Sequence, residues 1–430
     1  MKMINSQYNY FIPYKGKLLI FNGLTRRWIV LPTKDEQDAI EKILNNPDAF
    51  FENGNNNKLF QLLHNGGFIV LNRKIEKQKV LDATNKKNNA RHGHLCILTT
   101  YECNLRCWYC VQKHSGEQMS IGTQEKTKNF IKRFIEEEHL KSLHISFFGG
   151  EPLMNPDAIA NISTYAKKMC KKHAIPFHNS ITTNGTLIDN DLIEMFKEVE
   201  LTDFQITIDG TRDYHNKVKK SKYIIDTYRI VCSNITQLLT KMPNCDVTIR
   251  YNYTAKNLSL AVADDLIDSF DEKLRKNLEF LPRQVWQEDD SRIDENLLKE
   301  LIDIIQQNGF KVNKTVDMDY AQCYAESKYF FNIFHNGKID KCGNISPNKA
   351  IGEILSDGRV SWKKSLSTVY EHLANLSPPC LNCKYFPICF GPCLIRRRSA
   401  SETKQPLRCL YSNPDKYFEQ VILHYVESFE

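Results

Sequence analysis

The beginning of the chain alternates short apolar runs with turn residues. Residues 8–31 are rich in aromatic and β-branched side chains and are broken by two glycine-containing turns, which predicts paired strands. Residues 34–44 and 57–63 carry apolar side chains at helical spacing, and a further apolar strand is expected over 68–71. We therefore expect a small α+β domain over residues 1–71.

The next segment, residues 72–93, is rich in Lys and Asn and has few apolar side chains. This composition predicts a linker with room for one short helix. From residue 94 onward, strand-like and helical patterns alternate. The strand-like runs cover residues 94–100, 143–150, 178–185, 203–210, 245–254 and 278–286, and the helical runs cover 124–138, 156–172, 190–199, 223–239, 260–270 and 295–307.

Six β/α units of this kind predict a parallel sheet, open or curled into a partial (β/α)6 TIM-like barrel, over residues 94–310. In such folds ligands bind at the carboxyl ends of the strands. Polar and glycine-rich sequences fall at three of these ends: Gly149-Gly150-Glu151, Thr183-Asn184-Gly185 and Asp209-Gly210. The overall expectation is an α/β fold with its site at this edge.

The alternation stops after Val316, and seven cysteines follow between Cys323 and Cys409. Many thiols with little apolar periodicity predict a domain folded around metal, over residues 320–412. A final amphipathic helix is expected within residues 413–430.

Composition narrows the class of protein. The chain has 430 residues, 41% of them hydrophobic, which excludes disorder and predicts more than one domain. No apolar stretch approaches the ~18 residues of a membrane span, and the N-terminus lacks a signal-peptide core. We therefore expect a cytoplasmic protein with no membrane partner.

Charge and cysteine content add two further expectations. The net charge of +7 is spread along the chain, apart from Lys217–Lys222 and Arg396–Arg398, so we interpret it as solvated surface charge and expect no nucleic-acid partner. Thiols stay reduced in the cytoplasm, so clusters among the 14 cysteines indicate metal or catalysis before disulfides.

Three cysteines, Cys103, Cys107 and Cys110, directly follow the first strand of the β/α region. A structural zinc site needs four ligands, and no fourth Cys or His stands nearby. Three thiolates can instead hold three irons of a [4Fe-4S] cluster and leave the fourth iron open to a substrate or cofactor.

The spacing C-x3-C-x2-C, with an aromatic residue before the last cysteine, resembles the radical S-adenosylmethionine (SAM) enzymes, as does the Gly-Gly-Glu-Pro sequence after the second strand. The resemblance implies that the open iron binds SAM, whose reductive cleavage yields a 5'-deoxyadenosyl radical that abstracts hydrogen from the substrate. The residues that it implies as SAM contacts are Tyr109, Gly149, Gly150, Glu151, Pro152, Thr183, Asn184, Asp209 and Arg250, with Asn252 as an alternative to Arg250. An ordinary turn would also explain Thr183, Asn184 and Asp209, and a satisfied polar residue within a strand would explain Arg250 or Asn252.

The second set of cysteines begins at Cys323 and Cys342 and continues at Cys380, Cys383, Cys389, Cys393 and Cys409. The four thiols from Cys380 to Cys393 would also suit a zinc ion. The whole pattern resembles the SPASM extension of radical SAM enzymes that modify peptides. That resemblance implies two auxiliary [4Fe-4S] clusters, one bound by Cys380, Cys383, Cys389 and Cys409 and one by Cys323, Cys342 and Cys393, which would have only three thiols.

We expect a peptide substrate. The end of the first domain resembles PqqD-like domains, which bind precursor leader peptides at a sheet edge, although a cap over the barrel is the alternative. A maturase that closes a thioether or carbon-carbon crosslink in a ribosomally made peptide is the first interpretation, and a flavodoxin or ferredoxin-type protein is the expected electron donor. An anaerobic sulfatase-maturing enzyme is the second, but that family has an Asp after the cysteine matching Cys342, where this chain has Gly343. A non-catalytic iron-sulfur scaffold is the third.

Overall fold

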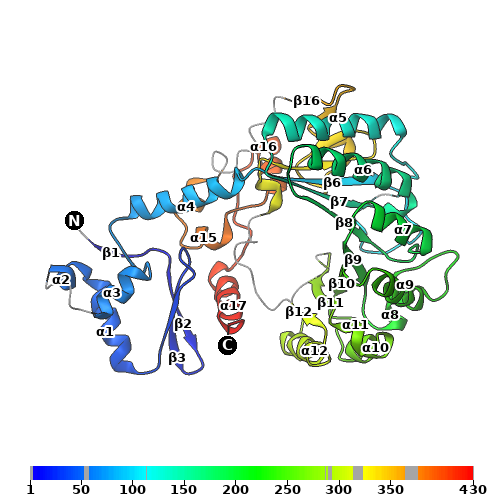
Figure 1. Ribbon diagram of the computed structural model, residues 1–430. Coiled ribbons are helices and arrows are strands. Elements are labelled where there is room, and N and C mark those ends of the chain that lie inside the picture. Colours follow the sequence, from blue (N-terminus) through cyan, green and yellow to red (C-terminus); the bar gives the residue numbers. More distant parts are fainter. Residues whose placement is uncertain are drawn as a thin grey trace. The chain divides into compact units, whose positions relative to one another are not determined.

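The computed structural model describes residues 3–52, 58–112, 114–285, 287–288, 293–312, 323–363 and 376–429. The chain divides into two compact units (Figure 1). The first, here the terminal unit, comprises residues 1–90, 314–328 and 364–430, and the second, the barrel unit, comprises residues 91–313 and 329–363. This division cuts across the expected linker 72–93 and the expected domain 320–412. Residues 1–2, 53–57, 113, 286, 289–292, 320–322, 364–375 and 430 of the predicted segments lie outside the described residues.

The barrel unit is built on one large sheet. Its strands run in the order β12-β11-β10-β9-β8-β7-β6-β13-β14-β15-β16, and those from β6 to β12 are parallel. All six predicted strands form, which confirms the α/β fold. They are β6 (His92–Thr100), β7 (Ser142–Gly149), β8 (Phe177–Thr183), β9 (Asp203–Ile208), β10 (Asp246–Tyr253) and β11 (Leu278–Gln284).

The sheet extends beyond the six predicted strands on both sides. On one side β12 (Lys311–Val312) pairs with β11, and on the other side β13 (Phe330–Ile333) pairs in parallel with β6. The remaining strands add antiparallel hairpins to β13. They are β14 (Lys338–Asp340), β15 (Gly352–Ile354) and β16 (Val360–Trp362). Part of the thiol-rich region is therefore continuous with the barrel sheet.

Helices cover the outer face of the sheet (Figure 1). The six predicted helices are confirmed as α5 (Ile121–Glu138), α6 (Pro156–Lys172), α7 (Asn190–Glu198), α9 (Thr227–Lys241), α10 (Ala261–Ser269) and α12 (Glu295–Gln307). Two short helices were not predicted, α8 (Arg212–Val218) and α11 (Glu272–Arg275). Serine or aspartate residues cap α5, α7, α9 and α12 at their N-termini, which fixes where these helices begin.

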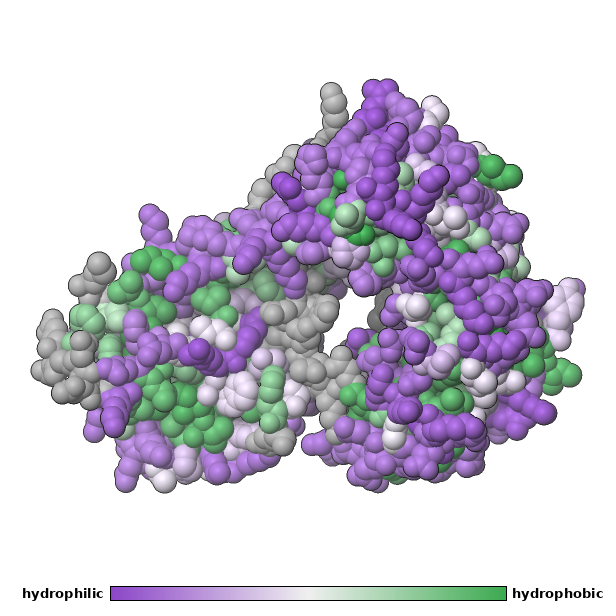
Figure 2. All heavy atoms as spheres, viewed as in Figure 1, coloured by the Kyte–Doolittle hydropathy of each residue, from purple (hydrophilic) through white to green (hydrophobic). Residues whose placement is uncertain are grey.

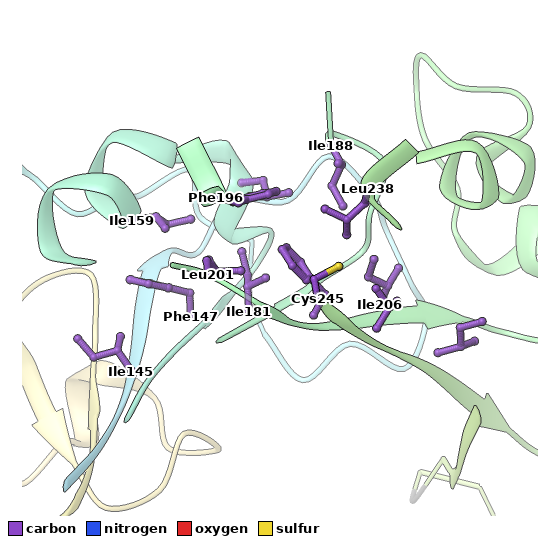
Figure 3. Packing of buried hydrophobic residues seen from close by; sticks show 14 of the residues in the cluster. Ile145, Phe147, Ile159, Ile181, Ile188, Phe196, Leu201, Ile206, Leu238 and Cys245 are labelled. Carbon is purple, nitrogen blue, oxygen red and sulfur yellow. The ribbon is translucent and has the colours of Figure 1, made fainter. Parts of the chain in front are cut away.

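Alternate residues of the parallel strands form the main core. Ile145 and Phe147 of β7, Ile181 of β8 and Ile206 of β9 are all buried against the helices, as Figure 3 shows. Cys245 packs in the same cluster, so this thiol is a core residue and not a ligand. The core holds the strands in register and so fixes where their carboxyl ends lie.

The terminal unit begins with the predicted small sheet. Strands β2 (Asn9–Tyr14), β3 (Lys17–Asn22) and β4 (Trp28–Leu31) form an antiparallel sheet, and β1 (Ile4–Asn5) pairs with β5 (Ile69–Val70). The helices of this part are α1 (Lys34–Asn45), α2 (Pro47–Glu52) and α3 (Lys58–Asn65). Thr33 and Glu36 form a capping box at the start of α1.

The expected linker is instead a sixteen-residue helix, α4 (Arg73–Asn88). Asn72 caps it by accepting a hydrogen bond from the Ile75 N–H. The buried residues Glu76, Val80 and Thr84 follow one another at intervals of four, so the helix buries a narrow stripe that is mostly polar. Apolar periodicity could not reveal this helix because only one of the three positions is apolar.

Short helices and one long helix complete the terminal unit. The short ones are η4 (Tyr324–Glu326), α14 (Pro378–Leu381) and α15 (Phe386–Cys389), followed by α16 (Leu394–Thr403). The predicted final helix is confirmed as α17 (Pro414–Glu427), whose Phe418 and Ile422 pack with Tyr10, Phe21 and Tyr385. Among the described residues, no helix has both the length and the apolar character required to cross a membrane.

Candidate active site

The three cysteines of the first motif lie on one loop that leaves β6 at its carboxyl end. Cys103 is buried, Cys107 is half-buried and Cys110 is exposed. The guanidinium group of Arg106 donates to the Cys103 carbonyl and pairs with Glu102 at 3.1 Å. We call this loop, residues 101–118, the cysteine loop. The contacts of Arg106 within it help to hold its shape.

The three thiols have the number and type of donors that an open [4Fe-4S] cluster takes from a protein, since each thiolate binds a different iron and one iron stays free. All three interact electrostatically, and burial raises the pKa of the Cys103 thiol to about 12. The expectation that no histidine stands near them is wrong, because His114 Nε2 lies 3.6 Å from the Cys110 sulfur.

Gly149 and Gly150 bring the end of β7 into contact with the base of the cysteine loop. The Gly150 N–H donates to the Thr100 carbonyl at 3.0 Å, and the Glu151 N–H donates to the Glu102 carbonyl at 2.8 Å. A Cβ at Gly149 would lie 2.4 Å from the Thr100 oxygen, and one at Gly150 would lie 2.0 Å from the Glu102 oxygen. The backbone at Thr100 and Glu102 therefore leaves no room for a side chain at either position, and both require glycine.

Glu151 is completely buried and ties two strand ends together. Its carboxylate accepts hydrogen bonds from Thr183 Oγ1 at 2.7 Å, from the Asn184 N–H at 2.8 Å and from the Leu153 N–H at 3.0 Å. Burial raises its pKa, and these donors oppose the rise. Pro152 begins the adjoining short helix η1 (Pro152–Met154). The side chains of Glu151 and Thr183 thus have internal partners.

Asn184 reaches the cysteine loop from the end of β8. Its Nδ2 lies 2.8 Å from Asn104 Oδ1 and 3.8 Å from the Cys103 sulfur. Its Oδ1 accepts hydrogen bonds from the backbone and hydroxyl of Thr186. Asn184 therefore orients the residues around the first thiol, a role compatible with the predicted site.

A second buried network joins the cysteine loop to β9 and β10. The Tyr109 hydroxyl donates to Asp209 at 2.5 Å and accepts from Lys219 Nζ at 2.9 Å and from Asn252 Nδ2 at 3.2 Å. Lys219 and Asp209 form an ion pair at 3.4 Å in which both side chains are nearly inaccessible. Arg250 donates from Nε to Asn252 at 2.9 Å, which places it next to this network. The structure thus brings four predicted residues together here.

Lys219 was missed by sequence reasoning. It stands in the basic run Lys217–Lys222, which reads as solvated charge, yet its side chain is buried and also donates to Thr207 Oγ1 at 2.8 Å. The nearby Asp209, Cys107 and Tyr109 raise the pKa of Lys219 well above its usual value, against the effect of burial. Only its position after the short, unpredicted helix α8 distinguishes it from its neighbours in sequence.

Four cysteines of the second set lie close together in the terminal unit. The Cys389 thiol, whose pKa burial raises to about 11, interacts electrostatically with the thiols of Cys383, Cys409 and Cys380. Tyr385 and Ile388, from the same short segment, pack into the cluster formed by the N-terminal sheet and α17. This grouping is compatible with the predicted four-thiol cluster.

The remaining three predicted ligands divide between the two units. Cys323 and Cys393 belong to the terminal unit and interact electrostatically. Cys342 belongs to the barrel unit, where its N–H donates to Asp340 at 3.3 Å.

A buried ion pair links the segments that carry Cys323 and Cys393. Arg397 of α16 contacts both carboxylate oxygens of Glu326, at 2.8 and 2.9 Å, and both side chains are almost fully buried. Arg397 also donates to the Pro392 carbonyl at 2.9 Å, next to Cys393. The pair therefore fixes the two thiols with respect to each other.

Comparisons with known proteins agree with this geometry. Residues 97–251 match the Radical SAM superfamily. The radical SAM cyclopropyl synthase TigE of Paramaledivibacter caminithermalis is 23% identical over 81% of this chain and 79% of its own. A cysteine-type anaerobic sulfatase-maturating enzyme of Clostridium perfringens is 21% identical over 74% of this chain and 92% of its own.

A solved structure resembles the chain over nearly its full length. It is Streptococcus suis SuiB bound to precursor peptide SuiA, which is 15% identical, with a TM-score of 0.51, over 95% of this chain and 99% of that one. The family match and the enzymes among the relatives set aside a non-catalytic scaffold. Residues 97–251 therefore form a radical SAM domain that uses SAM and a [4Fe-4S] cluster, and the chain is a radical SAM enzyme.

Proposed function

We propose that this radical SAM enzyme modifies a ribosomally synthesised precursor peptide, closing a thioether or carbon-carbon crosslink. One observation carries the proposal: the chain has both a cysteine loop that is held by internal hydrogen bonds and a small N-terminal sheet with helices, which belongs to a separate unit. The likeness to SuiB, solved with its precursor peptide, extends over 95% of this chain and supports the same proposal.

The chain supplies binding and orientation. Cys103, Cys107 and Cys110 would hold the SAM-binding cluster, and SAM supplies a hydrogen-abstracting radical when it is cleaved there. Glu151 and Asn184 hold the strand ends against the cysteine loop. Such bracing keeps the reacting groups in place and limits the access of water.

The two further sets of thiols would hold auxiliary [4Fe-4S] clusters. Cys380, Cys383, Cys389 and Cys409 form the complete set, and Cys323, Cys342 and Cys393 form the set with three thiols. Crosslink formation removes a second electron from the peptide after hydrogen abstraction, and an auxiliary cluster is a suitable acceptor for it.

The N-terminal sheet offers a place for a leader peptide. Within the described residues, β4 pairs with β3 on one side and with no other strand. An extended peptide can add to such an edge through backbone hydrogen bonds, while side-chain pockets select its sequence. This arrangement is our reason to assign leader binding to residues 1–71.

Formylglycine formation by a sulfatase-maturing enzyme is less well supported. A carboxylate after Cys342 would serve as the base in that reaction, and this chain has Gly343. A Cβ at Gly343 would lie 2.8 Å from Asn332 Oδ1, so a larger side chain requires Asn332 to move. The environment of this position thus suits glycine.

Anaerobic co-expression with the small open reading frame nearest its gene tests the proposal. Accurate mass and fragmentation of the peptide should show the loss of two hydrogens per modification, at a crosslink that resists alkylation. A matched culture expressing Cys107→Ala should return the unmodified peptide. An unchanged peptide in the presence of active SAM cleavage would contradict crosslinking, and formylglycine in a sulfatase-derived peptide would support the alternative.

A further inference from the structure

The connection between α8 and α9 is attached to the cysteine loop. The Arg106 N–H donates to the Lys220 carbonyl at 3.0 Å, and Leu105 and Ser221 form an antiparallel bridge. The exposed thiol of Cys110 belongs to the same loop. Residues 217–225 therefore border the segment that carries the SAM-cluster thiols.

Four large apolar side chains of these two segments are exposed. Tyr223 is 84% exposed and Ile225 is 98% exposed in the connection, and Trp108 and Val111 are about half exposed in the cysteine loop. In Figure 1 the connection lies at the edge of the barrel unit near α8 and α9, and Figure 2 shows pale and green side chains protruding there. Exposed apolar side chains on two segments that are joined by backbone hydrogen bonds indicate an interaction surface.

The surface is also positively charged. Lys217, Lys220 and Lys222 are all exposed. Three carboxylates lie on or next to these segments: Glu102 and Asp226 are each paired with an arginine, and Glu117 lies 3.3 Å from His335. None of these contacts involves a lysine of the connection. A few apolar contacts surrounded by charge of one sign favour a brief, electrostatically guided encounter over a permanent complex.

We propose that Lys217, Lys220, Lys222, Tyr223 and Ile225 form the docking surface for the electron donor, a small acidic protein with a low-potential one-electron centre. The proposal rests on the radical chemistry proposed above. In each encounter the donor loses one electron and the cluster held by the cysteine loop gains it. A donor is the favoured occupant because the lysines call for an acidic partner, and because electron transfer needs close approach to this loop. Small contact areas are typical of redox encounters.

The test compares two sources of electrons for SAM cleavage. The variants are K217E/K220E/K222E and Y223S/I225S, and each is supplied either with dithionite or with an acidic flavodoxin and its reductase. With dithionite, 5'-deoxyadenosine should form at the wild-type rate. With flavodoxin, the rate should fall by about tenfold or more in the lysine variant, and added salt should slow the wild type more than this variant.

Binding provides a second readout that does not depend on turnover. Titration of fluorescently labelled flavodoxin should show a Kd raised about tenfold by the lysine substitutions. The matched controls are K132E/K168E/K171E on α5 and α6, which makes the same charge change, and Ile121→Ser, which removes another exposed apolar side chain. Both controls should bind and accept electrons as the wild type does.

The outcomes separate the inference from the proposed function. Equal flavodoxin-driven rates and equal affinities in the variants and the wild type would overturn the docking surface. Normal SAM cleavage from both reductants with impaired peptide modification would assign the surface to the peptide and also overturn it. A wild type that yields no 5'-deoxyadenosine with dithionite would instead contradict the radical chemistry itself.

Discussion

The two cysteine-bearing regions differ in how the chain positions their thiols. The cysteine loop is attached to the ends of long parallel strands by backbone hydrogen bonds, by Glu151 and by the Tyr109–Asp209–Lys219 network. The thiols from Cys380 to Cys393 lie instead on or beside helices of four residues, α14 and α15. The barrel therefore braces its site through secondary structure, whereas the second region depends more on individual contacts and on the cluster that we propose for it.

This difference has a functional meaning. A cluster that must bind SAM and leave one iron open needs ligands held in place by the protein. A cluster with four protein thiolates can organise short, weakly structured segments around itself. Substitutions in the two regions should consequently affect different steps and different measurements.

Loss of one thiol from each region should give the largest contrast. We expect Cys107→Ala to abolish formation of 5'-deoxyadenosine, because the SAM-binding cluster loses a ligand. Cys389→Ala should retain uncoupled SAM cleavage but yield no modified peptide. Both are measured by chromatography of the nucleoside and mass spectrometry of the peptide, with circular dichroism to check folding. Cys170→Ala, at a buried core thiol, is the control and should keep both activities. Modified peptide from Cys389→Ala would contradict the division of roles.

The ion pair beside Cys323 and Cys393 should produce the next largest effect. Glu326→Gln leaves the buried Arg397 guanidinium without its charged partner, which should lower the free energy of unfolding by about 3 to 5 kcal/mol. Denaturant unfolding measures this change, and iron analysis should show reduced metal in the same variant. The control is Glu402→Gln: the Glu402 carboxylate is half-exposed, so its pair with Arg398 should contribute under about 1 kcal/mol. Equal stability of the two variants would show that the pair does not brace this region.

The same contrast explains which features the sequence could predict. The barrel strands were found because alternate residues such as Leu143, Ile145 and Phe147 face a continuous core. Helix α4 was not predicted, because its buried positions are Glu76, Thr84 and only one apolar residue. Strand β13 was not predicted, because it lies in the thiol-rich segment, after the regular alternation of strands and helices has ended.

The candidate site shows a similar limit. Spacing identified the cysteines, and glycine and carboxylate residues at strand ends identified the neighbourhood of the loop. The buried ion pair of Lys219 could not be predicted, because a lysine within a basic run looks like its exposed neighbours. Its role depends on the path of the chain after β9, which brings it to Asp209 and Tyr109. Contacts between residues so far apart in the sequence cannot be predicted from the pattern of neighbouring residues.

A methyl group at Gly150 tests the bracing of the cysteine loop directly. Gly150→Ala places a Cβ 2.0 Å from the Glu102 oxygen, so β7 and the loop must separate. We expect a loss of about 3 kcal/mol in unfolding free energy and reduced iron in the SAM-binding site. Gly122→Ala in α5, where the nearest atom would lie 3.9 Å away, should be neutral or slightly stabilising. Normal stability and iron content in Gly150→Ala would contradict the backbone requirement.

A pair of stacked histidines offers a smaller test that concerns the barrel alone. His94 and His144, near the beginnings of β6 and β7, stack with ring centres 4.3 Å apart and bond to Ser146 and Ser180. Burial lowers the pKa of His94 to about 3 and that of His144 to about 4. An unfolded histidine takes up a proton below about pH 6.5, whereas these two remain neutral in the fold. Acid therefore favours the unfolded chain, and stability falls as the pH drops from 6.5 towards 4.

His144→Gln should remove part of this dependence on pH. Between pH 7 and pH 5 the wild type should lose about 2 kcal/mol more unfolding free energy than the variant, because glutamine does not titrate. Denaturant unfolding of the iron-free protein at the two pH values measures the difference in the absence of the metal. An identical loss in wild type and His144→Gln would mean that His144 takes up its proton equally in both states. A clear difference would show that the buried, neutral His144 makes the stability of the barrel depend on pH.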